Sequence, residues 1–200
     1  MKRSALLAAA IPLYLGLFPD FSLAQSVSIS RSILPDQPYT LIYPEGMVVS
    51  GGTDTPLVLN HPNAPVRCDI AIVPVEDTNW TAQAALGALD PTEVTAAWAD
   101  TLPGFSLVST GLVDFQDAKA LSYEGTSTES PMGVPLTLVH AETVSNARGY
   151  ALDCVYATEA AADAKPLVDF IIANFATRSD ADCCIGATVV PEPEGETATP

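Results

Sequence analysis

The stretch at residues 134–158, VPLTLVHAETVSNARGYALDCVYAT, contains two apolar runs on either side of a short polar segment. In both runs large apolar side chains alternate with small or polar ones, which is typical of strands that bury one face. Between them, Asn146-Ala147-Arg148-Gly149 carries residues that favour tight turns. The pattern predicts a β-hairpin with strands at residues 134–146 and 149–158.

Two more strands are expected just before this hairpin, at residues 105–115 and 119–126. The connections between the four strands are short, which permits antiparallel pairing but not parallel pairing. Shorter runs of similar character predict further strands at residues 39–43, 47–49, 56–59 and 66–75. The sheet is therefore expected to be mainly antiparallel.

Helical patterns lie between and after these strands. An Ala-rich run at residues 80–89 follows three possible N-caps, Asp77, Thr78 and Asn79. A second helix is expected from Asp90 and Pro91, with an apolar stripe of Val94, Ala97, Trp98, Thr101 and Leu102. A closing helix is expected from near Asp163, with an inner edge of Leu167, Phe170, Ile171, Asn174 and Phe175. The fold class is therefore α+β, a mainly antiparallel sheet flanked by helices.

Several local phrases in this order are similar to those of a known superfamily. They are YPEGM, LPGFSLVSTGLVDF, AKALSYEG, RGYALDCVYATE and PLVDFIIANF. Over residues 39–177 the chain resembles the PsbP-like α-β-α sandwich superfamily, and most of all its exported bacterial branch. The superfamily includes an extrinsic photosystem II subunit and a Ran-binding nuclear-transport factor. The resemblance implies a non-catalytic binding or assembly role and transfers no active site.

The N-terminus has the pattern of a secretory signal peptide. Lys2 and Arg3 precede an apolar stretch at residues 5–18 that is too short to span a bilayer, and Ser22-Leu23-Ala24 is a suitable cleavage site. We expect a signal peptide at residues 1–24 and an extended lead-in at 25–38. A single globular domain is expected at 39–187, followed by a disordered acidic tail at 188–200. The mature protein is predicted to be periplasmic or secreted, with no membrane-spanning segment.

The charge balance limits the possible partners. The formal net charge of the chain is −16, from 8 basic and 24 acidic residues. So few cations cannot neutralise a row of phosphates, which argues against nucleic acid as a partner. The resemblance to the PsbP-like superfamily implies an unidentified protein as the partner.

The four cysteines are Cys68, Cys154, Cys183 and Cys184, an even number in a chain predicted to be exported. No CxxC or HxxxH spacing indicates a metal site, and Asp180 and Asp182 disfavour a reactive thiolate at the adjacent pair. Cys68 and Cys154 could bond to each other if their strands adjoin, leaving Cys183 and Cys184 as a vicinal pair. We favour two bridges that join Cys183 and Cys184 to the two strand cysteines, because adjacent residues of an extended segment point in opposite directions.

No catalytic motif stands out. The chain contains neither G-x-S-x-G nor H-E-x-x-H nor S-x-x-K, and a triad of Ser127, His140 and an aspartate would be of a kind that almost any chain offers. We therefore predict no catalytic, cofactor-binding or metal-binding residue. The expected function is that of an exported non-catalytic module. The alternative is a small hydrolase or metal-dependent enzyme that uses Asp69, Asp153 or His140, in which case these groups should converge in a cleft.

Overall fold

The computed structural model describes residues 31–33, 37–52, 55–130 and 132–179. The predicted signal peptide and tail, together with Cys183 and Cys184, lie outside these residues. Among the described helices, none has the length and apolar character that crossing a membrane requires.

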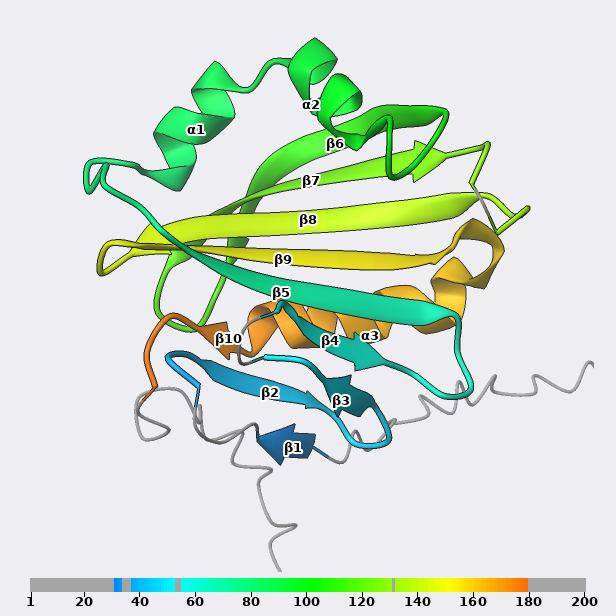
Figure 1. Cartoon of the computed structure of the whole chain (residues 1–200), viewed down its shortest axis with the longest axis horizontal. Helices are drawn as coiled ribbons and strands as arrows, with labels where there is room; N and C mark the ends of the chain where they lie inside the picture. Colours follow the sequence, from blue (N-terminus) through cyan, green and yellow to red (C-terminus); the bar gives the residue numbers. More distant parts are fainter. Residues whose placement is uncertain (1–30, 34–36, 53–54, 131, 180–200) are drawn as a thin grey trace, which may run out of the picture.

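A seven-stranded sheet forms the centre of the fold, with strand order β3-β4-β5-β9-β8-β7-β6 (Figure 1). Every neighbouring pair in it is antiparallel. Its strands are β3 (Val48–Ser50), β4 (Leu57–Asn60), β5 (Val66–Pro74), β6 (Phe105–Asp114), β7 (Lys119–Ser127), β8 (Leu136–Ser145) and β9 (Arg148–Ala157). The predicted antiparallel meander is confirmed, and β5 extends it by pairing with β9.

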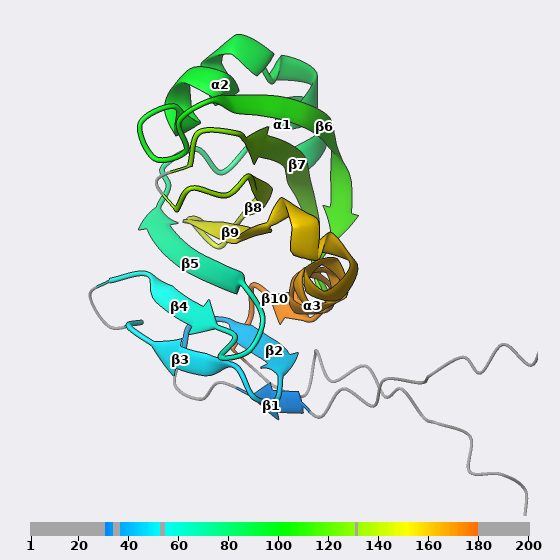
Figure 2. The same ribbon diagram turned by 90° about the vertical axis from the view of Figure 1, so that its right-hand side faces the viewer.

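Helices cover both faces of this sheet (Figures 1 and 2). On one side lie α1 (Ala82–Ala88) and α2 (Pro91–Trp98), and on the other lies α3 (Ala161–Ala173), which follows the short 3₁₀ helix η1 (Thr158–Ala160). A second, three-stranded sheet consists of β1 (Arg31–Ile33), β2 (Thr40–Pro44) and β10 (Phe175–Ala176). The α+β fold class predicted from the sequence is confirmed.

The β8–β9 hairpin has the turn that its sequence predicts. Asn146 and Ala147 form a two-residue loop with φ values of 52° and 57°. Two successive residues in this left-handed region make a type I′ turn, whose twist matches that of the two strands. The turn also sets the register of the whole hairpin, because it pairs Ser145 with Arg148.

The main core lies between the sheet and α3. It includes the fully buried residues Cys68, Leu152, Val168, Ile171 and Phe175. Buried Phe175 lies in β10, beyond the end of α3, and Ile171 is the expected residue that does lie on the inner edge of the closing helix. Buried Ala164, Val168 and Ile172 also belong to it, whereas Leu167, Phe170 and Asn174 are only half-buried.

Two predictions about the first helices are wrong in detail. The cap of α1 is Thr81, whose hydroxyl accepts a hydrogen bond from Ala84 N at 3.2 Å, whereas Asp77 closes a local turn on Asn79 N before the helix begins. The stripe on α2 is not uniformly buried. Val94 and Trp98 are half-buried and pack against the cluster that contains Leu102, a residue beyond the end of α2. Ala97 and Thr101 are exposed.

Candidate functional site

A row of polar side chains crosses the sheet on the face that carries α1 and α2. Asp69 of β5 lies opposite Asp153 of β9, Asp153 opposite His140 of β8, and His140 opposite Tyr123 of β7. Directly opposed residues on neighbouring strands point to the same side of a sheet. Asp69, Asp153 and His140, the three residues singled out from the sequence, therefore lie in one continuous row.

His140 is held on both sides of its ring by carboxylates. Its Nδ1 lies 2.6 Å from Asp153 Oδ1, and its Nε2 lies 3.5 Å from Glu142 Oε2. The histidine side chain is 9% exposed, against 26% for Asp153 and 40% for Glu142. The imidazole is thus buried, whereas its two partners reach the surface.

Aromatic rings enclose the same histidine. The Tyr123 ring stacks on the His140 ring with centroids 4.4 Å apart, and Trp98 approaches His140 edge-on at 6.5 Å. Trp98 Nε1 donates a hydrogen bond to the Tyr123 hydroxyl at 2.8 Å. This bond ties α2 to the sheet directly above the row.

The surroundings of His140 determine its charge. Burial lowers its pKa, but the carboxylates of Asp153 and Glu142 more than offset this and raise the pKa to about 9. The same contact with His140 lowers the pKa of Glu142. Burial raises the pKa of Tyr123 to about 12, so the phenol stays neutral. At neutral pH the centre of the row is an imidazolium between two carboxylates.

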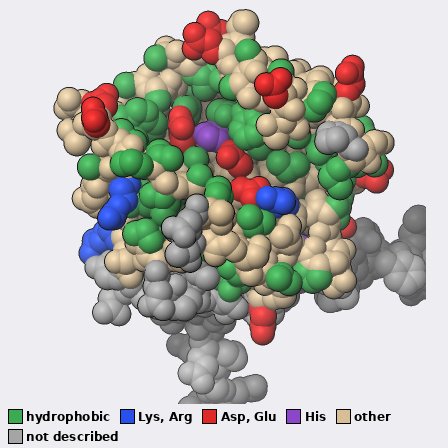
Figure 3. Space-filling model, in the orientation of Figure 1, with side chains coloured by type: hydrophobic (Ala, Val, Ile, Leu, Met, Phe, Trp, Pro, Cys, Tyr) green, Lys and Arg blue, Asp and Glu red, His purple; other side chains and the backbone are tan. Residues whose placement is uncertain are grey.

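A shallow depression of about 350 Å³ opens between the row and the helices α1 and α2. Its lining residues are Ala85, Ala88, Leu89, Asp90, Glu93, Val94, Ala97, Leu121, Tyr123, His140 and Glu142. We call this depression the acidic hollow. Figure 3 shows a histidine at the bottom of a hollow on this face, with carboxylates beside it and apolar side chains around it. No lysine or arginine is among these described lining residues.

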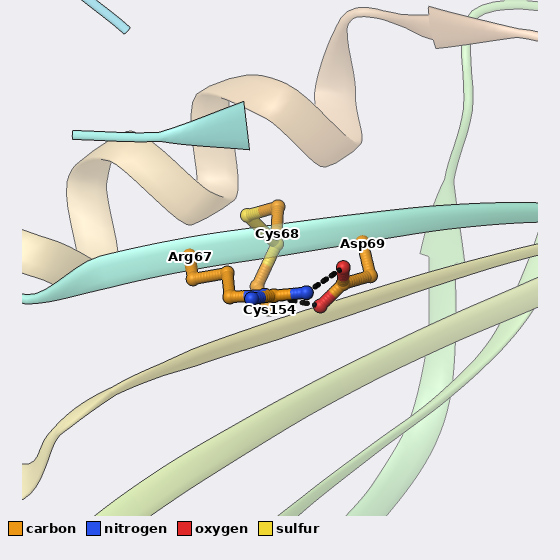
Figure 4. The surroundings of a disulfide bond; sticks show 4 residues. All are labelled: Arg67, Cys68, Asp69 and Cys154. Atoms are coloured by element: carbon orange, nitrogen blue, oxygen red, sulfur yellow. Dashed lines mark hydrogen bonds and ion pairs between the residues drawn. A yellow bond between two sulfur atoms is a disulfide. The ribbon is translucent and has the colours of Figure 1, made fainter. Parts of the chain in front are cut away.

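At one end of the row Asp69 is engaged by Arg67. Arg67 Nε and Nη2 donate to the two carboxylate oxygens of Asp69 at 2.8 and 2.7 Å, and hydrogen bonding to Asp69 raises the pKa of the guanidinium. Both residues flank Cys68 on β5 (Figure 4). Asp69 therefore has a counter-ion of its own and does not share that of Asp153.

On the opposite face of the same strands, Cys68 and Cys154 form a disulfide (Figure 4). They lie directly opposite each other on β5 and β9, with Cα atoms 4.0 Å apart. The favoured pairing of Cys68 and Cys154 with the tail cysteines is therefore wrong. The alternative is correct for these two residues, which bond to each other because their strands are neighbours. The adjacency of β5 and β9 in the sheet brings the two thiols together.

The overall fold of the chain is similar to that of known proteins. The solution structure of cyanobacterial PsbP (CyanoP) from Synechocystis sp. PCC 6803 superposes with a TM-score of 0.54, covers 79% of this chain and 98% of that chain, and shares 14% identity. The Ran-binding protein Mog1p of Saccharomyces cerevisiae gives a TM-score of 0.52, with 78% of this chain and 100% of that chain covered at 9% identity. The chain has the PsbP-like fold. No protein-family model and no curated protein sequence matches it. At these identities the likeness establishes the PsbP-like fold alone.

Within the PsbP-like fold, the hypothetical triad does not form. Ser127 Oγ donates to Pro103 O at 2.6 Å, whereas the ring nitrogens of His140 face Asp153 and Glu142. Among the described residues, no group of three or more His, Cys, Asp or Glu side chains is arranged to hold a metal ion.

Sequence reasoning missed Tyr123 and Glu142 and treated Trp98 only as core. Glu142 carried a usable signal, because it lies two residues after His140 and so shares its face of the strand. Tyr123 and Trp98 carried none, since their positions depend on how β7 and α2 meet β8.

Proposed function

We propose that this protein is an exported, non-catalytic module that binds a protein partner through the acidic hollow. The N-terminal pattern at residues 1–24 supports export, and so does the Cys68–Cys154 disulfide, because disulfides persist in oxidising compartments. Mog1p, which has the same fold, is a Ran-binding protein, so the fold is compatible with protein recognition. The chemistry of the acidic hollow indicates the kind of side chain that the partner would present.

The observation that carries the proposal is the double engagement of His140. A histidine that acts as a general base must be neutral and must present a free nitrogen to the substrate. Here the pKa of His140 is raised to about 9, and both nitrogens face carboxylates. Asp69, Asp153 and His140 lie in one row, but of the three only His140 is among the described residues that line the hollow. The direction of its pKa shift also removes the neutral base that a hydrolase would need at neutral pH.

The lining of the acidic hollow favours one kind of contact. Carboxylates of Asp90, Glu93 and Glu142 stand beside small apolar side chains such as Ala88 and Ala97. A lysine or arginine combines an apolar stem with a cationic head and fits both parts of such a surface. The proposed partner therefore inserts a basic side chain between α1, α2 and the sheet.

Site-specific photo-crosslinking in the envelope of the native host tests this proposal. A photoreactive residue at Ala88, in the hollow, should capture one discrete protein, and Glu93→Lys should abolish the product by reversing the charge. The matched control is Ala162, an exposed alanine on α3. Equal capture from Ala88 and Ala162, or capture that Glu93→Lys leaves unchanged, would count against the proposal.

The hydrolase alternative needs its own measurement. Purified protein is incubated with p-nitrophenyl acetate at neutral pH, beside a His140→Gln variant. We expect the two rates to be equal. Turnover that is lost in His140→Gln would instead support the enzyme.

A further inference from the structure

Strand β6 forms one edge of the seven-stranded sheet. On one side it pairs with β7 from Phe105 to Asp114, and on the other it pairs with no strand in the described part of the chain. Figure 2 shows this outer side of β6 running from the α2 end of the molecule towards α3. A free edge presents backbone N–H and C=O groups that can pair with another strand.

The two edges of the sheet differ in how they are protected. The opposite edge, β3, has 3 residues, whereas β6 has 10. β6 contains neither lysine nor proline, and its Val108 and Leu112 side chains are 60% and 38% exposed. Short length, lysine and proline are the usual means by which proteins blunt an edge. On β6 the irregularity between Leu107 and Ser109 interrupts the pairing surface, and α1 and α2 contact the strand.

A groove of about 450 Å³ runs along β6 on the α3 side of the sheet. Residues 109–114 line one wall, Lys165 and Asp169 of α3 line the other, and Glu124 lies between them. Lys165 is already paired with Asp169 at 3.1 Å, and Asp114 is paired with Lys119. Glu124 is a third carboxylate in the groove, and its charge contributes to the raised pKa of Lys165. With one lysine against three carboxylates among its described lining residues, the groove retains a net negative charge.

We propose that the free edge of β6 receives an extended segment of another protein as an additional antiparallel or parallel strand. Main-chain hydrogen bonds would supply affinity, and alternate side chains of the segment would enter the groove, as in β-augmentation. The segment is neutral or basic, because Glu124 and the net charge of −16 disfavour acidic ligands. The same charge disfavours a second copy of this chain, since pairing two β6 edges would bring two such grooves together.

The proposal does not depend on the acidic hollow, which opens on the other face of the sheet under α1 and α2. The β6 edge would recognise the backbone and the alternate side chains of an extended segment, whereas the acidic hollow would recognise one cationic side chain. A negative result of the photo-crosslinking experiment at Ala88 would not contradict the proposal for the β6 edge.

The test uses the full mature chain and a synthetic peptide of about eight residues, alternating valine and threonine with a lysine at each end. Binding is followed by fluorescence anisotropy at up to about 1 mM protein, and its location by amide hydrogen exchange. Backbone pairing should slow exchange selectively in β6. One control peptide replaces alternate residues with proline, which cannot complete a ladder, and a second replaces lysine with glutamate.

Substitutions on β6 and on β3 then show which edge of the sheet binds the peptide. Leu112→Lys and, separately, Val108→Lys should weaken binding of the peptide by about tenfold or more. Val48→Lys, at a 57% exposed valine on β3, should leave it unchanged. Unaltered exchange in β6, binding that survives both β6 substitutions, or equal binding of the proline peptide would overturn the proposal. A dimer in sedimentation equilibrium that Val108→Lys dissolves would overturn it in favour of a second copy.

Discussion

On β5 and β9, residues 68 and 154 face α3, whereas residues 69 and 153, one step along each strand, face α1 and α2. The first pair is a disulfide between two side chains with no exposed surface. The second pair is two aspartates directly opposite each other, an arrangement that is destabilising unless each charge is compensated. Arg67 compensates Asp69, and His140 compensates Asp153.

This comparison shows how one pair of strands can combine two kinds of stability. The α3 face depends on a covalent link and on apolar burial, neither of which titrates at neutral pH. The opposite face depends on the protonation of His140 and on an exposed ion pair, so it responds to pH and to salt. A substitution on the α3 face should therefore leave the pH and salt dependence of stability unchanged. A substitution on the opposite face should leave the contribution of the disulfide unchanged.

The largest effect is expected on the α3 face. Replacing Cys68 and Cys154 together by serine should lower the free energy of unfolding by about 2–5 kcal/mol, because the disulfide closes a loop across 86 residues of sequence. Urea unfolding of the variant and the native chain measures this. Peptide mapping without reductant should recover a Cys68–Cys154 peptide. A map that instead links either residue to Cys183 or Cys184 would restore the pairing first favoured from the sequence.

The second effect belongs to His140. Its pKa is raised from 6.5 to about 9, so its contribution to stability is complete below pH 6.5 and is lost as the pH rises through 9. From this shift, the loss between these values is up to about 3 kcal/mol. The pKa values of Tyr39 and Tyr123, both about 12, keep these phenols neutral over the same interval.

Urea unfolding at pH 6.5 and at pH 9 checks the His140 prediction. The native chain should lose stability between the two values, His140→Gln should show a much smaller loss, and the double cysteine variant should keep the native slope. An equal slope in His140→Gln would mean that groups outside the row cause the pH dependence.

A smaller effect is expected from Tyr123→Phe. The change removes the hydroxyl that accepts the Trp98 indole N–H and should cost about 1 kcal/mol, because Trp98 is only half-buried and water can replace the bond. Tyr43→Phe is the matched control, at a half-buried tyrosine whose hydroxyl makes no hydrogen bond to another described residue. If both variants lower the free energy of unfolding by the same amount, the hydrogen bond from Trp98 to Tyr123 does not hold α2 to the sheet.

Part of the row was accessible from the sequence. A two-residue turn at Asn146 and Ala147 fixes the hairpin register, and His140 and Asp153 lie the same number of residues from it, so their contact follows. Asp69 and Tyr123 join the row through β5–β9 and β7–β8 pairings that no tight turn fixes. The cysteine pairing favoured from the sequence was wrong for the same reason, because the Cys68–Cys154 bond depends on β5, which is not a neighbour of β9 in the sequence.

The smallest effect concerns Arg67, whose side chain is 56% exposed. Arg67→Gln should cost less than about 1 kcal/mol, since exposed ion pairs typically contribute about 0.2–1 kcal/mol. The expected loss has a second component, because Asp69 without its partner faces Asp153 directly. Asp69→Asn should therefore be close to neutral, and the double variant Arg67→Gln with Asp69→Asn should be more stable than Arg67→Gln alone.

The salt dependence of stability should distinguish the exposed Arg67–Asp69 pair from the buried His140. Raising the ionic strength to about 1 M shortens the screening length to about 3 Å, so the difference between Arg67→Gln and the native chain should shrink. The difference caused by His140→Gln at pH 6.5 should persist, because that imidazolium is 9% exposed and little ionic atmosphere reaches it. A salt-independent Arg67→Gln effect as large as that of His140→Gln would show that Asp69 and Asp153 share both cations, and the row would then be one coupled network rather than two separate pairs.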